Sequence, residues 1–183
     1  MLMTKSRYGL NIRLIKGFPY ILNRGELMWR NANGFAAGVG LRIEVLEVDS
    51  ILKIGENIKV NDYVHIGVAG QMIIEGKCLI GSRVTIIDHD HGEYTSHYGE
   101  ENFSSTQPDT RPIVIKNVVI GKNTWIAEGV VILSGSEIGS GCIVGANSVV
   151  RGSFPSNVMM VGAPAKIVKR FDSSCGKWIR SSN

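Results

Sequence analysis

Histidines are the residues of this chain best suited to chemistry, and three of the four lie close together in one polar segment: His89, His91 and His97. The fourth, His65, lies earlier in the chain. An unperturbed histidine has a pKa of about 6.5, so it can take a proton from a hydroxyl group at neutral pH. Histidine is also a frequent zinc ligand, so the four residues together are a competing candidate metal site. The histidines therefore predict a functional site but leave its chemistry open.

The scaffold that must position these histidines is indicated by aliphatic residues that recur at every sixth position. A period of six matches neither an α-helix nor the two-residue alternation of a simple strand. It is typical of a β-helix, in which each hexapeptide forms one flat face and three faces close one coil. The sequence therefore predicts an all-β solenoid with an aliphatic interior. The six-spaced residues are Val48, Ile54, Val60, Ile66, Ile74, Ile80 and Ile86 in a first block, and Val114, Ile120, Ile126, Ile132, Ile138, Val144 and Val150 in a second.

The six-residue spacing is interrupted twice. The step from Ile66 to Ile74 is eight residues, which predicts a two-residue bulge within Val68–Gln71. The step from Ile86 to Val114 is 28 residues, which is not a multiple of six, so a long loop must leave the coils there. Loops on a rigid scaffold often carry function. We therefore expect the excursion, residues 88–112, to be the segment that presents the histidines.

The remaining residues flank the coils. Residues 1–42 lack the repeat and are interpreted as a cap with a short amphipathic helix broken at Gly17 and Pro19, because a solenoid must cover its open end. Residues 43–152 are expected to form the β-helix with its excursion. Residues 153–183 are expected to form a hairpin and a basic tail, for which we consider a helix.

Composition limits the class of protein. The 183 residues carry a formal net charge of +4, and much of the excess lies in residues 166–180. Little aromatic content accompanies these cations, which argues against nucleic acid as a partner. No apolar run is long enough to cross a bilayer and no secretory signal is recognised, so we expect a cytoplasmic chain; peripheral membrane contact through basic residues of the cap stays open. Cys78 and Cys142 are interpreted as packing residues.

Together these motifs resemble a known family. The hexapeptides, the histidine loop, the segment 123–129 (Asn-Thr-Trp-Ile-Ala-Glu-Gly) and the segment 161–168 (Val-Gly-Ala-Pro-Ala-Lys-Ile-Val) are similar to those of left-handed β-helix acyltransferases. The nearest branch contains galactoside, maltose, xenobiotic and polysaccharide O-acetyltransferases. The resemblance, over residues 48–170, implies a left-handed coil and a homotrimer with active sites between neighbouring chains. It also implies transfer of an acetyl group from acetyl-CoA to a sugar hydroxyl, with a cell-surface polysaccharide or its precursor as acceptor.

The resemblance also implies roles for the histidines and their neighbours. His89, the first histidine after the coil, matches the catalytic base of the family. His91 is the nearest rival, because both side chains face the same side of an extended segment. Asp88 or Asp90 is expected to orient the imidazole, unless a backbone carbonyl does so. On the acceptor side the implied residues are His65, His91 and Asp88, with His65 near a position where some relatives have Asn.

A second set of residues matches the cofactor side of the family's site. The backbone N–H groups near Ala127 and Glu128 match the donors that stabilise the tetrahedral oxyanion, and Glu128 is therefore placed with the catalytic residues. Some relatives carry a small hydroxyl residue at position 128, so a side-chain donor there is in doubt. The implied cofactor-binding residues are Trp125, Ala127, Ala146, Arg151, Lys166 and Lys169, the last three as cations near the phosphates.

Three alternatives remain at this point. A sugar-amine N-acetyltransferase would use the same cofactor and a related base, and is the main rival. A β-helix carbonic anhydrase would use histidines as zinc ligands, but it would need neither the Trp125 segment nor the basic closing segment. A trimeric scaffold without activity would leave the histidine-rich excursion unexplained. We therefore predict an acetyl-CoA-dependent O-acetyltransferase without a metal ion.

Overall fold

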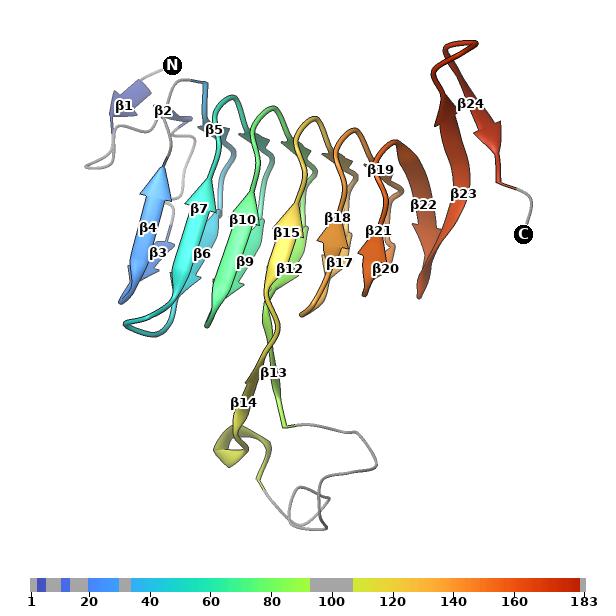
Figure 1. Cartoon of the computed structure of the whole chain (residues 1–183). Coiled ribbons are helices and arrows are strands. Elements are labelled where there is room, and N and C mark those ends of the chain that lie inside the picture. The colour runs from blue at the N-terminus through green and yellow to red at the C-terminus, as the bar shows by residue number, and fades with distance from the viewer. Residues whose placement is uncertain (1–2, 6–10, 14–19, 30–33, 93–106, 182–183) are drawn as a thin grey trace.

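The structure is a computed structural model that describes residues 3–5, 11–13, 20–29, 34–92 and 107–181. Short parallel strands stack into coils, and each coil contributes one strand to each of three sheets (Figure 1). Within a coil the chain passes from the first sheet to the second and then to the third, and it returns to the first sheet to begin the next coil. The predicted fold class, an all-β solenoid of hexapeptide repeats, is confirmed.

The sheets define three faces of a prism. The first sheet contains β3 (Tyr20–Asn23), β6 (Arg42–Val45), β9 (His65–Val68), β12 (Thr85–Ile87), β17 (Val131–Ile132) and β20 (Val149–Val150). The second contains β4 (Glu26–Trp29), β7 (Ile51–Ile54), β10 (Gln71–Ile74), β15 (Val118–Ile120), β18 (Glu137–Ile138) and β21 (Ser153–Phe154). The third contains β5 (Ala36–Ala37), β8 (Lys59–Val60), β11 (Leu79–Ile80), β16 (Trp125–Ile126), β19 (Ile143–Val144) and β22 (Val158–Gly162).

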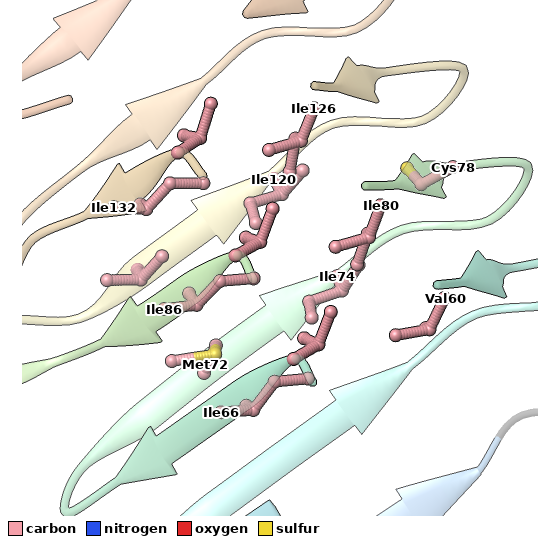
Figure 2. Close-up of a cluster of buried hydrophobic side chains, with 14 of the residues drawn as sticks. Val60, Ile66, Met72, Ile74, Cys78, Ile80, Ile86, Ile120, Ile126 and Ile132 are labelled. Atoms are coloured by element: carbon pink, nitrogen blue, oxygen red, sulfur yellow. The ribbon is translucent and has the colours of Figure 1, made fainter. Parts of the chain in front are cut away.

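The core lies inside the prism and consists of the six-spaced side chains. Ile66, Ile74 and Ile80 occupy equivalent inward positions of the three sheets, and Figure 2 shows the residues of neighbouring coils stacked on them. Because these side chains are fully buried, each contributes a few kcal/mol, and truncating one to Ala would cost about 2–5 kcal/mol of stability. Cys78 and Cys142 are buried beside this stack, which confirms their role in packing; burial raises the pKa of both thiols.

Two members of the six-residue series do not face the core. Val48 is 80% exposed, because the turn between β6 and β7 is long and Val45 fills the inward position instead. Val114 lies outside the coils and pairs with Asp90 in a separate two-stranded ribbon. Val48 and Val114 match the six-residue spacing in the sequence only by coincidence, and the prediction that their side chains face the core is wrong.

Both ends of the chain form strands where helices were considered. β1 (Met3–Lys5), β2 (Asn11–Arg13) and β3 are strands, so the predicted helix is wrong for the described part of the cap; Gly17 and Pro19 lie outside the described residues. β3, β4 and β5 already belong to a coil. At the other end, β21 and β22 continue the coils past residue 152. The basic tail is also a strand pair rather than a helix: β23 (Ala165–Asp172) and β24 (Lys177–Arg180) extend the third sheet in antiparallel fashion.

The predicted excursion projects from the coils as a ribbon (Figure 1). β13 (His89–His91) pairs in antiparallel fashion with β14 (Ile113–Ile115), and a 3-10 turn, η2 (Pro108–Thr110), precedes β14. The ribbon leaves at the corner between the first and second sheets, which we call the ribbon corner, and residues 93–106, including His97, lie outside the described residues. In the part of the chain that the structure describes, we find no helix with the length and apolar character needed to cross a membrane.

Candidate active site

His89 lies at the base of the ribbon, next to a buried carboxylate. Its Nδ1 is 3.1 Å from Oδ1 of Asp88, and the His89 side chain is 15% exposed whereas that of Asp88 is completely buried. If the ring is neutral with its proton on Nδ1, that N–H donates to Asp88 and the Nε2 lone pair is left to accept a proton. The arrangement fits a general base whose orientation and tautomer are held by a carboxylate.

The predicted bulge explains why a carboxylate can be buried at this place. Oδ1 of Asp88 accepts the backbone N–H of Ala69 at 2.8 Å, and Oδ2 accepts the N–H of Gly70 at 2.9 Å. A buried charge is costly unless hydrogen bonds replace its water, and these two donors supply them. Gly70 leaves room for the ribbon here, because a Cβ at this position would overlap the side chain of Ile115. The bulge therefore builds the support of His89.

A second histidine is paired with a carboxylate on the outer face of the first sheet. Nε2 of His65 lies 2.9 Å from Oε2 of Glu44, and Oε1 of Glu44 accepts a hydrogen bond of 2.8 Å from the Arg42 guanidinium. This guanidinium also lies over the ring of Tyr20, 5.6 Å from its centre. The Arg42 hydrogen bond is the main reason why the pKa of Glu44 is lowered, and the same bond raises the pKa of Arg42. The carboxylate of Glu44 is therefore held in its ionised form.

The two histidines approach the same point, which lies above Gly67. A Cβ at Gly67 would be 3.4 Å from Cε1 of His89 and 3.6 Å from Nε2 of His65. Strand register explains this meeting, because Gly67 of β9 is the partner of Glu44 in β6 and of Ile87 in β12, just before the ribbon begins. The structure thus brings His89, Asp88 and His65 close together, and it adds Glu44 and Arg42 to them.

Sequence reasoning missed Glu44 and Arg42, although a signal was present. Arg42 and Glu44 alternate with the inward Ile43 and Val45, which places both polar side chains on the outer face of a strand. Nothing in the sequence indicates that this strand lies beside the strand of His65, because that follows only from the stacking of coils.

The other carboxylate of the ribbon, Asp90, bonds to residues of the coils and not to His89. Oδ2 of Asp90 accepts a hydrogen bond of 2.5 Å from the Ser134 hydroxyl and one of 3.3 Å from Arg151. Arg151, predicted near the cofactor phosphates, therefore bonds to the ribbon in this structure. Asp88, and not Asp90, bonds to the imidazole of His89. His91 is exposed near the outer part of the ribbon, paired in register with Ile113.

The predicted cofactor residues lie on another edge of the prism. Trp125 points outward, 48% exposed, as predicted, next to the buried Ile126. Ala127, Glu128 and Ala146 follow at the corner between the third and first sheets, which we call the cofactor corner. The N–H of Ala127 donates to the carbonyl of Val144, so of the two predicted oxyanion donors the N–H of Glu128 remains.

The two predicted halves of the site are therefore not brought together within one chain. His89 and Asp88 lie at the ribbon corner and His65 lies on the first sheet, whereas Trp125 and Glu128 lie at the third sheet and the cofactor corner. Lys166 and Lys169 lie on β23, which extends the third sheet. Over the described ranges, no three His, Cys, Asp or Glu side chains are grouped so that they could hold a metal ion. The zinc alternative gains no support from these residues.

Comparisons with known proteins place this geometry in a family. The model of the bacterial transferase hexapeptide family, with six repeats, matches residues 117–152. WbbJ of Escherichia coli (strain K12), whose provisional description is a lipopolysaccharide biosynthesis O-acetyl transferase, is 39% identical over 178 residues, or 97% of this chain and 88% of WbbJ.

Solved structures agree with that relative. A hexapeptide-repeat acetyltransferase of Vibrio cholerae, complexed with acetyl coenzyme A, has a TM-score of 0.56 and 26% identity over 67% of this chain and 61% of that one. A galactoside acetyltransferase in complex with coenzyme A has a TM-score of 0.58 and 27% identity over 67% and 56%. This chain thus spans less than two thirds of either structure. The fold and these likenesses define the class of hexapeptide-repeat transferases, and the chain belongs to that family. Within it, the chain is an acetyltransferase, as predicted.

Proposed function

We propose that this protein transfers the acetyl group of acetyl-CoA to a sugar hydroxyl, with His89 as general base. The observation that carries the proposal is the His89–Asp88 pair, in which a fully buried carboxylate is fixed by two backbone N–H groups and faces Nδ1 of the imidazole. The complexes of the two solved relatives with acetyl coenzyme A and coenzyme A support the choice of acetyl donor. The likeness to WbbJ, described as a lipopolysaccharide biosynthesis O-acetyl transferase, supports an O-linked product and a cell-surface polysaccharide as acceptor.

The reaction follows from this geometry. Nε2 of His89 takes the proton of the acceptor hydroxyl while the hydroxyl oxygen bonds to the thioester carbon. Asp88 stabilises the imidazolium that forms, because its buried charge faces the protonated ring. The N–H of Glu128 donates to the oxyanion of the tetrahedral intermediate. When the carbon–sulfur bond breaks, the thiolate of coenzyme A takes the proton from His89, and the base is restored.

The separation of the two halves supports a homotrimer. His89 at the ribbon corner of one chain would face Trp125 and Glu128 at the cofactor corner of a neighbour, so that a complete site forms between chains. In that arrangement Trp125 and Ala146 lie along the pantetheine arm, and Lys166 and Lys169 lie near the phosphates. We assign Arg151 to the phosphates as well, once its bond of 3.3 Å to Asp90 is exchanged. His91 and His65 face the acceptor.

The N-acetyltransferase alternative remains the second candidate, because an amine acceptor would use the same base and the same acetyl donor. No observation in the structure favours it over O-acetylation. The cytoplasmic location and peripheral membrane contact expected from the sequence stay predictions.

The test is a thiol-release assay with acetyl-CoA and a panel of sugars and amino sugars. We expect turnover with a hydroxyl acceptor, and a loss on the order of a thousandfold in His89→Ala, which is typical of removing a general base. His91→Ala tests the rival base, and we expect it to lose far less turnover than His89→Ala. If His91→Ala lost activity while His89→Ala kept it, the base would be assigned wrongly; turnover of amino sugars alone would favour the N-acetyltransferase.

A further inference from the structure

The pair formed by His65 and Glu44 does not contribute to the core. In β6 and β9 the inward side chains are Ile43, Val45 and Ile66, all of which are buried. Glu44 and His65 lie on the opposite, outer face, and their side chains are 12% and 34% exposed. Polar side chains paired on an outer face contribute little to stability, so the core alone gives no reason for a chain of Arg42, Glu44 and His65 at this place.

The hydrogen bonds of this pair decide what His65 offers to a ligand. Glu44 is ionised and accepts from Arg42 through Oε1, so its Oε2 fixes the proton of His65 on Nε2. In the neutral ring the other nitrogen, Nδ1, is then an acceptor, and it has no hydrogen-bond partner among the described residues. An acceptor nitrogen on a partly exposed ring fits the O–H of a sugar. It does not fit an anionic group, which would need a donor.

The His65 ring lies close to the catalytic base. Nε2 of His65 and Cε1 of His89 both lie within contact distance of the Cβ position of Gly67, so a single small ligand can reach both rings. The absence of a side chain at Gly67 leaves room between them. Tyr20 and Arg42 continue the same outer face, with an aromatic ring and a guanidinium plane that a sugar ring can pack against.

We propose that His65 and Glu44 are a positioning pair for the acceptor. Nδ1 of His65 accepts a hydrogen bond from a second hydroxyl of the same sugar ring whose reacting hydroxyl is deprotonated by His89. The ligand class is a neutral sugar with at least two neighbouring hydroxyl groups, and the pair selects which of them is acetylated. The inference rests on the proposed function, because it needs His89 as the base.

The test measures kcat/KM with methyl glycosides of galactose, glucose and mannose, and then with monodeoxy derivatives of the fastest of them. The variants are His65→Ala and Glu44→Gln. In Glu44→Gln, Arg42 retains the amide oxygen, so the amide NH2 faces His65 and moves the ring proton to Nδ1. Glu137→Gln is the matched control, since Glu137 lies on the outer face of the second sheet, where its carboxylate accepts a hydrogen bond from Ser153.

We expect both variants to lower kcat/KM for the parent glycoside about tenfold, the effect of one lost hydrogen bond. With the wild type, one monodeoxy derivative should show about the same tenfold decrease in kcat/KM relative to the parent glycoside. With the variants, that derivative and the parent should have equal kcat/KM values. The KM for acetyl-CoA should stay unchanged in all proteins. If the pair had only a structural role, both variants would lower kcat/KM for all substrates by the same factor. Gly67→Ala, which places a methyl group against both rings without a strained backbone, should raise the acceptor KM and leave the melting temperature unchanged or higher.

The outcomes separate the two proposals. If the wild type turns over no methyl glycoside faster than it hydrolyses acetyl-CoA, the proposed function fails and the inference fails with it. If the wild type is active but His65→Ala and Glu44→Gln keep its kcat/KM, or lose further activity with every deoxy derivative, the positioning pair is wrong while His89 keeps its role.

Discussion

The two pairs near Gly67, His89 with Asp88 and His65 with Glu44, each join an imidazole to a carboxylate, but the two carboxylates are held in place in different ways. Asp88 is completely buried and is held by backbone N–H groups of the bulge, so neither the carboxylate nor His89 can change its orientation without disturbing a coil. Glu44 is held by the side chain of Arg42, which is itself 55% exposed. The first pair is part of the scaffold, and the second is attached to its surface.

This difference separates two tasks that one site must perform. A general base gains from a fixed position and tautomer, because misplacement of the reacting groups by about 1 Å can cost a hundredfold in rate. A group that selects the acceptor tolerates adjustment, and its support can vary without damage to the fold. We call Asp88 and His89 the buried pair, and Glu44 and His65 the open pair. We therefore expect substitutions in the buried pair to lower both stability and kcat, and substitutions in the open pair to change only the kinetic constants for the acceptor.

The largest effect is expected for Asp88→Asn. The amide NH2 would face a backbone N–H of the bulge, which leaves a buried donor unsatisfied and lowers the free energy of unfolding by about 1–3 kcal/mol. Loss of the negative charge also removes the group that stabilises the imidazolium of His89, so kcat should fall about 10²- to 10⁴-fold. Denaturant unfolding and thiol-release kinetics measure the two effects. A variant with normal stability and normal kcat would show that the backbone support of Asp88 is irrelevant to the base.

The contrast between the pairs also shows what the sequence could predict. Inward packing is repeated in every coil, so the period of six located Ile74, Ile80 and Ile126 in the core without knowledge of any long-range contact. The pairing of Glu44 with His65 depends on two coils lying side by side, and the step from one coil to the next is not constant in length. The long turn before β7 moved Val48 out of the core for the same reason. The bulge was predicted from spacing, but its N–H groups could not be assigned to Asp88.

A smaller effect is expected for Ser134→Ala, which tests whether the ribbon must be anchored for the buried pair to act. The variant removes the 2.5 Å hydrogen bond to Asp90 and leaves the weaker one from Arg151. One lost hydrogen bond corresponds to about 0.5–1.5 kcal/mol, so we expect kcat to fall up to about tenfold. The acceptor KM should change less than kcat, since His65 and Glu44 lie on β6 and β9 and not on the ribbon. A rise in the acceptor KM without a change in kcat would contradict this assignment.

The smallest effect is expected for Arg42→Met, measured as the pH dependence of the acceptor KM. In the wild type the Arg42 hydrogen bond lowers the pKa of Glu44 below its ordinary value of about 4.3. Because the pKa is lowered, the ionised Glu44 contributes its full stabilisation at pH values above the ordinary pKa. This stabilisation is lost as the pH falls through the pKa of the folded state. Without Arg42 the pKa of Glu44 rises, so the acid limb of the KM profile should move to higher pH. At pH 7, where Glu44 stays ionised in both proteins, we expect only a few-fold rise in KM, as is usual for exposed ion pairs. An unchanged acid limb would mean that Glu44 does not govern acceptor binding, whereas the profile of kcat, set by the buried pair, should be the same in both proteins.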